Sequence, residues 1–150
     1  MCKNSRMEVE EEESKEEFTM NSPRESFDSL KIKVYRDGNE RAYMKLFYSI
    51  YDTRHPQDLL PYSLVMANKF NSPMGTINVF YDLTHSYANR IEDIDSITAN
   101  LAIEYLFKAA KMKNESAIDI IKMYSLEYNP KTNRDQIINM YSHWKKKDTK

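Results

Sequence analysis

Residues 102–117, which read AIEYLFKAAKMKNESA, decide the fold because they join two amphipathic helical patterns through a short polar turn. Ala109 and Ala117 lie eight positions apart, one on each side of this turn. Ala67 and Gly75 show the same spacing around another polar turn. Small side chains at such positions leave room for two helix axes to approach closely. The pattern therefore predicts helical hairpins.

The hairpin pattern recurs along the chain. Ala42, Gly75 and Ala117 stand near the start of successive helices, at intervals of 33 and 42 residues, and a large apolar side chain follows each of them by one turn. Such a period is typical of helical-repeat proteins. A single hairpin cannot bury its apolar stripe alone, so about three must stack. We therefore predict an all-α fold.

Capping and breaking signals divide the chain into about seven helices and predict no strand. Gly38 suits the left-handed end of the first helix, and Asn129 with Pro130 is expected to end the sixth. The expected N-caps are Ser22, Asn39, Asp58, Ser72, Ser96, Asn114 and Thr132. Only two glycines occur in 150 residues. This scarcity argues against a phosphate-binding loop, a nucleophile elbow and a β-barrel with many turns.

Charge is unevenly distributed along the chain. The first 29 residues carry nine acidic and four basic side chains, although the net charge of the whole chain is only −1. The run from Glu10 to Glu13 brings like charges together, so we expect residues 1–21 to be disordered. Residues 22–147 form the expected repeat domain, and residues 148–150 form a tail. Neither part has the dense positive field of a dedicated DNA-binding protein.

The single cysteine and the absence of long apolar runs bear on the compartment. Cys2 cannot form a disulfide within the chain, which suits a reducing environment. The first residues show no apolar segment of a secretory signal, and no apolar run approaches the roughly 20 residues that cross a bilayer. We therefore expect a soluble cytoplasmic protein that makes no membrane contact.

Residues 102–110, followed by Asn-Glu-Ser-Ala at residues 114–117, resemble the Sel-one-like branch of the tetratricopeptide-like repeats. In that family an alanine, an aromatic-rich turn and Lys-Ala-Ala end one helix, and a small polar turn with an alanine opens the next. Residues 38–42 resemble the same turn. The leucine–glycine pair of the first helix and the glycine-rich loop are missing, so the repeats are degenerate. The resemblance implies a right-handed α-solenoid of about three helix-turn-helix repeats.

The resemblance also implies a binding surface, because the first helix of each hairpin lines the concave face in related folds. The residues at the corresponding positions are Arg41, Met44, Tyr48, Tyr51, Ile77, Tyr81, His85, Asp119 and Met123. Aromatic and arginine side chains are favoured at protein-binding hot spots. The alternative is that most of these residues are ordinary packing residues in a chain with eleven tyrosines.

The sequence offers little for catalysis. His55, His85 and His143 are too far apart in sequence for a local metal-binding motif. Asp82 and His85 share one helical face, but a helical di-metal site would need this pair twice, with further carboxylates. Cys2 lies in the terminal segment, where no base is placed to activate it. We therefore expect no catalytic residue, no cofactor and no bound metal.

Together these observations predict a non-catalytic adaptor that binds a protein or peptide along its inner face. One rival is an inhibitor or immunity-type protein that blocks a basic partner, and another is a small-molecule-binding protein or enzyme built around His85. Residues 144–147, Trp-Lys-Lys-Lys, raise nucleic acid or anionic lipid as partners, but a solvated helix end is the simpler interpretation. The acidic N-terminal segment suggests a weak, salt-sensitive cover that folds back on the basic C-terminal end or on the groove. The unpaired first helix suggests, as a further alternative, a weak homodimer formed with a second copy.

Overall fold

The computed structural model describes residues 25–52 and 55–147, and within these ranges the chain is all-α, with seven α-helices and no strand. The helices are α1 (Phe27–Asp37), α2 (Glu40–Tyr51), α3 (Leu60–Lys69), α4 (Pro73–His85), α5 (Ser96–Lys111), α6 (Glu115–Tyr124) and α7 (Asn133–Lys147). Two 3₁₀ turns, η1 (Pro56–Leu59) and η2 (Ile91–Asp93), lie in the connections. The predicted class and helix count are confirmed. The expected disordered segment and the tail lie outside the described residues.

Three of the predicted N-caps are confirmed by the same hydrogen bond. In each, the capping side chain accepts the backbone N–H of the small residue three positions on, at 2.8–3.0 Å. The pairs are Asn39 with Ala42, Ser72 with Gly75, and Asn114 with Ala117. Gly38 ends α1 in the left-handed conformation at φ 61°, also as predicted. Caps and small residues therefore coincide at the start of α2, α4 and α6.

Two other caps differ from the prediction in the N-terminal half. Ser26 caps α1 by accepting the N–H of Ser29 at 3.1 Å, whereas Ser22 lies outside the described residues. Asp58 caps no helix, because η1 begins at Pro56 and places Asp58 inside a 3₁₀ turn. Helix α3 continues directly from that turn and has no side-chain cap.

The C-terminal half departs from the prediction at both ends of the α5–α6 hairpin. Asp95, not Ser96, caps α5, because its carboxylate accepts from both the backbone N–H and the hydroxyl of Thr98, at 2.8 and 2.7 Å. Helix α6 ends at Tyr124, before the predicted break at Asn129. Ser125 terminates it in the left-handed conformation, at φ 49°.

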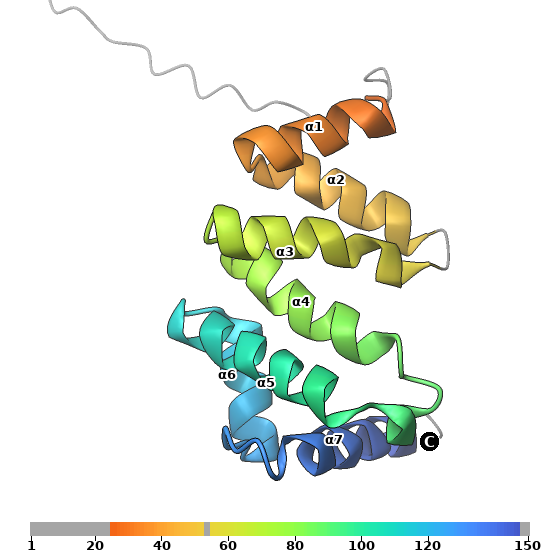
Figure 1. Cartoon of the computed structure of the whole chain (residues 1–150), viewed down its shortest axis with the longest axis vertical. Coiled ribbons are helices and arrows are strands. Elements are labelled where there is room, and N and C mark those ends of the chain that lie inside the picture. The colour runs from red at the N-terminus through yellow and green to blue at the C-terminus, as the bar shows by residue number, and fades with distance from the viewer. Residues whose placement is uncertain (1–24, 53–54, 148–150) are drawn as a thin grey trace, which may run out of the picture.

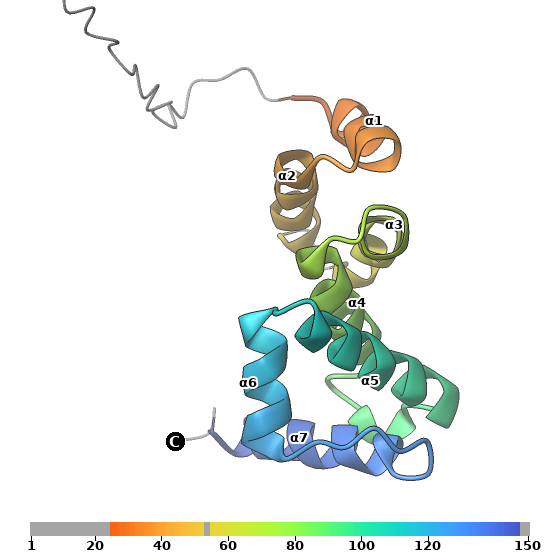
Figure 2. The same cartoon turned by 90° about the vertical axis from the view of Figure 1, so that its left-hand side faces the viewer.

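The helices follow one another along the long axis of the molecule (Figure 1). Figure 2 shows α2 and α6 on one side of the stack and α1, α3 and α5 on the other, with α7 across the lower end. Helices α3 and α4 cross closely at Gly75, where a Cβ atom would lie 2.5 Å from the Cβ of Met66. The close approach predicted from small residues is therefore present at this crossing.

The buried side chains form two large apolar clusters with a bridge between them. The first cluster joins α1, α2 and α3 and contains Leu30, Val34, Tyr43, Leu46 and Met66. The second joins α4, α5, α6 and α7 and contains Phe80, Ile103, Leu106, Ile137 and Met140. Ala67, Val79 and Tyr105 lie between them.

None of the described helices combines the length and the apolar character needed to cross a membrane.

Candidate protein-binding face

Exposed aromatic rings on α2 are held in place by a half-buried neighbour. Tyr48 and Tyr51 are 61% and 52% exposed. Phe47 packs against the first apolar cluster and contacts both of them, stacking on Tyr51 at 5.5 Å between ring centroids and meeting the edge of Tyr48 at 5.4 Å. The rings therefore reach solvent in fixed orientations, so less side-chain freedom is lost when a partner binds.

A second aromatic pair lies one helical turn apart near the end of α4. The rings of Tyr81 and His85 stack with centroids 5.5 Å apart, and both side chains are half-buried. Burial raises the pKa of the Tyr81 hydroxyl and lowers the pKa of the His85 imidazole. Both groups are therefore neutral near pH 7, and this part of the surface presents rings and hydrogen-bonding groups without charge.

Helix α7 extends this aromatic surface from the other end of the chain. The hydroxyl of buried Tyr141 donates to Thr84 Oγ1 at 2.7 Å, and its ring meets the edge of His85 at 6.3 Å. Trp144 contacts Tyr141 at 4.7 Å between centroids. Burial raises the pKa of Tyr141, and the nearby hydroxyls of Tyr81 and Tyr51 raise it further. Tyr51 of α2 therefore lies within electrostatic reach of α7.

We call the resulting surface the aromatic face. It consists of Tyr48, Tyr51, Tyr81, His85 and Trp144, together with the buried ring of Tyr141, which contacts His85 and Trp144. Three helices far apart in sequence supply it, because α4 is packed between the N-terminal and C-terminal halves of the molecule.

A groove between α6 and α7 adjoins the aromatic face. It encloses about 390 Å³ and is lined by Met123, Tyr124, Ser125, Leu126, Gln136, Asn139, Met140 and His143. The ring of Tyr124 meets the edges of His143 and Trp144, each at 6.0 Å. Its hydroxyl is buried and has no hydrogen-bond partner among the described residues. The phenol is therefore a hydrogen-bonding group that its own surroundings leave unsatisfied.

The structure brings together four of the nine residues predicted for the binding surface. Tyr48, Tyr51, Tyr81 and His85 belong to the aromatic face. Met123 is 64% exposed and lines the adjoining groove. Arg41 is exposed and Met44 is half-buried on the earlier turns of α2, on the side that carries Tyr48 and Tyr51, and Asp119 is exposed on α6.

The prediction that Ile77 lies on the binding surface is wrong. This residue was expected on the exposed inner face, but only 4% of its surface is accessible and it belongs to the second apolar cluster. Every residue from Gly75 to Phe80 is buried, because α3 and α5 both pack against α4 and leave this part of the helix no exposed side. The exposed part of the α4 face begins only at Tyr81.

The contribution of α7 to the aromatic face was not predicted from the sequence. Tyr141 is not among the residues predicted for the binding surface, and Trp144 is considered only with the lysines that follow it. Their spacing of three residues places both on one face of a helix, which was the available local signal. The contact with Thr84 spans 57 positions and has no local signature.

Asp82 and His85 do not form the pair that their spacing suggested. The side chain of Asp82 turns into the core, where it accepts a hydrogen bond from Ser63 at 2.6 Å. The Ser63 hydroxyl also lies 2.9 Å from the Tyr43 hydroxyl, which accepts from the Asn78 amide at 2.8 Å. Burial raises the pKa of Asp82 to about 7.

Within the described residues, no three histidine, cysteine, aspartate or glutamate side chains gather in a set that could hold a metal ion.

Comparison of the chain with protein-family models, curated proteins and solved structures found no match.

Proposed function

We propose that this protein is a non-catalytic adaptor that binds a protein or peptide through the aromatic face, on a short tetratricopeptide-like repeat array. One observation carries the proposal: α4 is joined by hydrogen bonds to both α2 and α7, and these three helices carry six aromatic rings, of which the two on α2 are more than half exposed. Tyrosine and tryptophan supply much of the affinity at protein interfaces, because they bury large areas with few rotatable bonds.

The proposed mechanism is recognition by a surface that is formed before the partner arrives. Phe47 orients the two rings of α2, the stacked pair on α4 is half-buried, and Tyr141 is fixed by its bond to Thr84. An apolar partner side chain packs against these rings, while the tyrosine hydroxyls bond its polar groups.

The proposal is tested with paired alanine variants. A tagged full chain retrieves partners from a lysate of its own cells, and the affinity of each identified partner is then measured by calorimetry with the wild type and with Tyr48→Ala/Tyr51→Ala. The double variant is expected to lose at least tenfold in affinity, because each hot-spot residue contributes more than about 1 kcal/mol.

Ile97→Ala/Tyr128→Ala is the matched control. These two side chains are also exposed, by 82% and 51%, but they lie on α5 and after α6, which supply no residue of the aromatic face. The control is expected to bind like the wild type. Equal affinity in the test variant and the wild type, with helical content unchanged in both, would refute the assignment of the aromatic face.

A further inference from the structure

Helix α1 exposes apolar side chains on the side that faces away from the rest of the molecule. Leu30 and Val34 point into the first apolar cluster and are buried. On the opposite side Ile32 is 55% exposed and Tyr35, beside it, is 41% exposed. Phe27 is also 41% exposed, but it lies seven residues before Val34 and therefore on the same side of α1 as Val34. Of the described helices, α1 carries the most large apolar side chains that are exposed to solvent, and it lies at one end of the stack (Figure 1).

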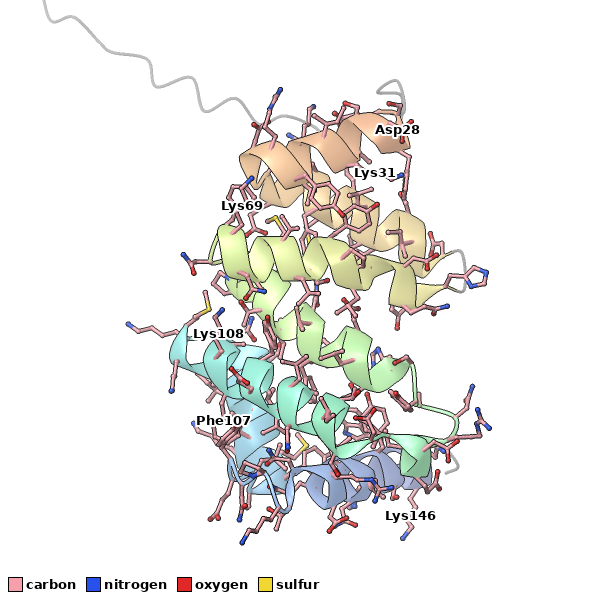
Figure 3. The ribbon with its side chains drawn as sticks, viewed as in Figure 1. Asp28, Lys31, Lys69, Phe107, Lys108 and Lys146 are labelled. Atoms are coloured by element: carbon pink, nitrogen blue, oxygen red, sulfur yellow. The ribbon has the colours of Figure 1, made fainter. Side chains whose placement is uncertain are left out.

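The exposed side of α1 is a shallow apolar hollow with charges at both ends. It is lined by Asp28, Lys31, Ile32, Tyr35 and Arg36. Figure 3 labels Asp28 and Lys31 on this terminal helix. The ammonium of Lys31 lies 3.5 Å from the Asp28 carboxylate and 4.7 Å above the Phe27 ring. Its charge is therefore partly compensated within the helix.

The charges on α1 are arranged so that the surface complements itself. Asp28, Ile32 and Arg36 follow at four-residue steps and so form one row along the exposed side. Ile32 is at the centre of this row, with an acid four residues before it and a base four residues after it. An antiparallel copy of the row, related by a two-fold axis at Ile32, places each Asp28 opposite Arg36 of the second copy. Rows of this kind interdigitate in the commonest class of helix packing.

We propose that a second copy of this chain docks on the exposed side of α1, antiparallel and about a two-fold axis at Ile32. The interface is isologous, with the two isoleucines in contact at the centre and two Asp28–Arg36 ion pairs at its ends. Arg36 also bonds Asp37 through two nitrogens, at 2.7 and 2.9 Å, but its guanidinium has five N–H donors in all. Tyr35 flanks the centre and adds apolar area.

The size of this surface sets the strength of the association. Eleven residues of helix are about 16 Å long, so the contact falls at the small end of specific interfaces. We expect a dissociation constant on the order of 1–100 μM, in the range of weak homodimers. The mass measured by sedimentation equilibrium should therefore rise with concentration from 17.8 kDa towards twice that value.

Charge reversal tests the proposed pairing. Asp28→Arg places two arginines opposite each other at both ends of the interface, and Arg36→Asp places two aspartates there. Each variant alone is expected to stay monomeric up to concentrations about tenfold above the wild-type dissociation constant. The double variant D28R/R36D should dimerise again. An equimolar mixture of D28R and R36D should form heterodimers only, which native mass spectrometry resolves by mass.

Matched controls separate this pairing from a general effect of charge. Glu115→Arg also replaces an acid in the first turn of a helix, and Lys111→Asp also replaces a base in a last turn. Both controls should dimerise like the wild type, and circular dichroism should show that all variants remain helical.

Two outcomes would overturn the proposal. One is a wild type that stays monomeric at millimolar concentration, in which case zero-length cross-links from Lys31 to the acidic residues 8–17 would assign this surface to the N-terminal segment. The other is a mixture of D28R and R36D that forms no heterodimer, which would exclude the antiparallel alignment.

Discussion

The hydroxyl of Ser63 on α3 donates a 2.6 Å hydrogen bond to the carboxyl group of Asp82 on α4, and both side chains are buried. The other polar groups of this cluster, Tyr43 and Asn78, are neutral, so no cation compensates the carboxylate. The carboxyl group therefore holds its proton more tightly in the folded chain than in the unfolded one.

This proton makes stability depend on pH. The pKa of Asp82 rises from an ordinary value near 3.8 to about 7 on folding. Between these values the folded state binds the extra proton, so the free energy of unfolding falls as the pH rises from about 4 to about 7. The three-unit difference corresponds to a loss of up to about 4 kcal/mol. Urea denaturation at pH 5 and pH 8 covers about two of these three units and should show a loss of about 2–3 kcal/mol.

Asp82→Asn is the control for this prediction. An amide does not titrate, so the difference in stability between pH 5 and pH 8 should be smaller in the variant by the contribution of Asp82. At pH 8 the variant should be more stable than the wild type, because it no longer buries a charge. A pH dependence identical to that of the wild type would mean that Asp82 is ionised in the folded chain at both pH values.

Gly75→Ala should destabilise the chain. Alanine ordinarily stabilises a helix relative to glycine by about 1 kcal/mol. Here the new methyl group would lie 2.5 Å from the Cβ of Met66 and 3.0 Å from the backbone nitrogen of Ala67, so α3 and α4 would have to separate. We expect a net loss of about 1–3 kcal/mol in the free energy of unfolding. The sign of the change in the free energy of unfolding, measured by chemical denaturation, shows whether the clash with α3 outweighs the higher helix propensity of alanine.

The cap of α5 is tested by two neighbouring substitutions. Asp95→Ala removes two hydrogen bonds to Thr98 and should cost about 0.5–2 kcal/mol of stability. Ser96→Ala should change stability by less than about 0.5 kcal/mol, because Ser96 is exposed and does not cap the helix. If Ser96→Ala is the more damaging change, the helix begins one residue later than the structure shows.

Tyr141→Phe should weaken the fold while preserving the aromatic face. The substitution removes the hydrogen bond to Thr84, whose hydroxyl keeps its own bond to the carbonyl of Phe80. We expect a loss of about 1 kcal/mol in thermal or chemical unfolding, with the ring contacts to His85 and Trp144 retained. Partner affinity should stay within about twofold of the wild type, which would separate the structural role of the hydroxyl from the binding role of the rings.

Local signals in the sequence were sufficient where a capping side chain precedes a small residue by three positions. Asn39, Ser72 and Asn114 each precede a small residue by three positions, and all three cap the helices predicted from them. The prediction for Asp58 was wrong because the 3₁₀ turn that begins at Pro56 includes this residue. The prediction for α5 was wrong because two possible caps are neighbours. Asp95 competes with Ser96, and the carboxylate is the cap because it bonds both the amide and the hydroxyl of Thr98.

The candidate site was only partly predictable for a different reason. Exposure of Tyr48 and Tyr51 follows from their place on α2, but burial of Ile77 depends on α3 and α5 packing together against α4. The contribution of Tyr141 depends on α7 returning to the end of α4, a relationship between distant parts of the chain. Periodicity describes one helix at a time and contains no information on these contacts.

The polar cluster of Tyr43, Ser63, Asn78 and Asp82 also restricts how the helices can be assembled. Helices with similar apolar stripes could slide past one another by a turn at little cost, because leucine and isoleucine accept many neighbours. A shift of α3 by one turn would remove Ser63 from Asp82 and leave a carboxyl group facing hydrocarbon. These four polar groups therefore specify how α2, α3 and α4 align with one another. The chain is less stable for burying them, but only one alignment of the three helices satisfies their hydrogen bonds.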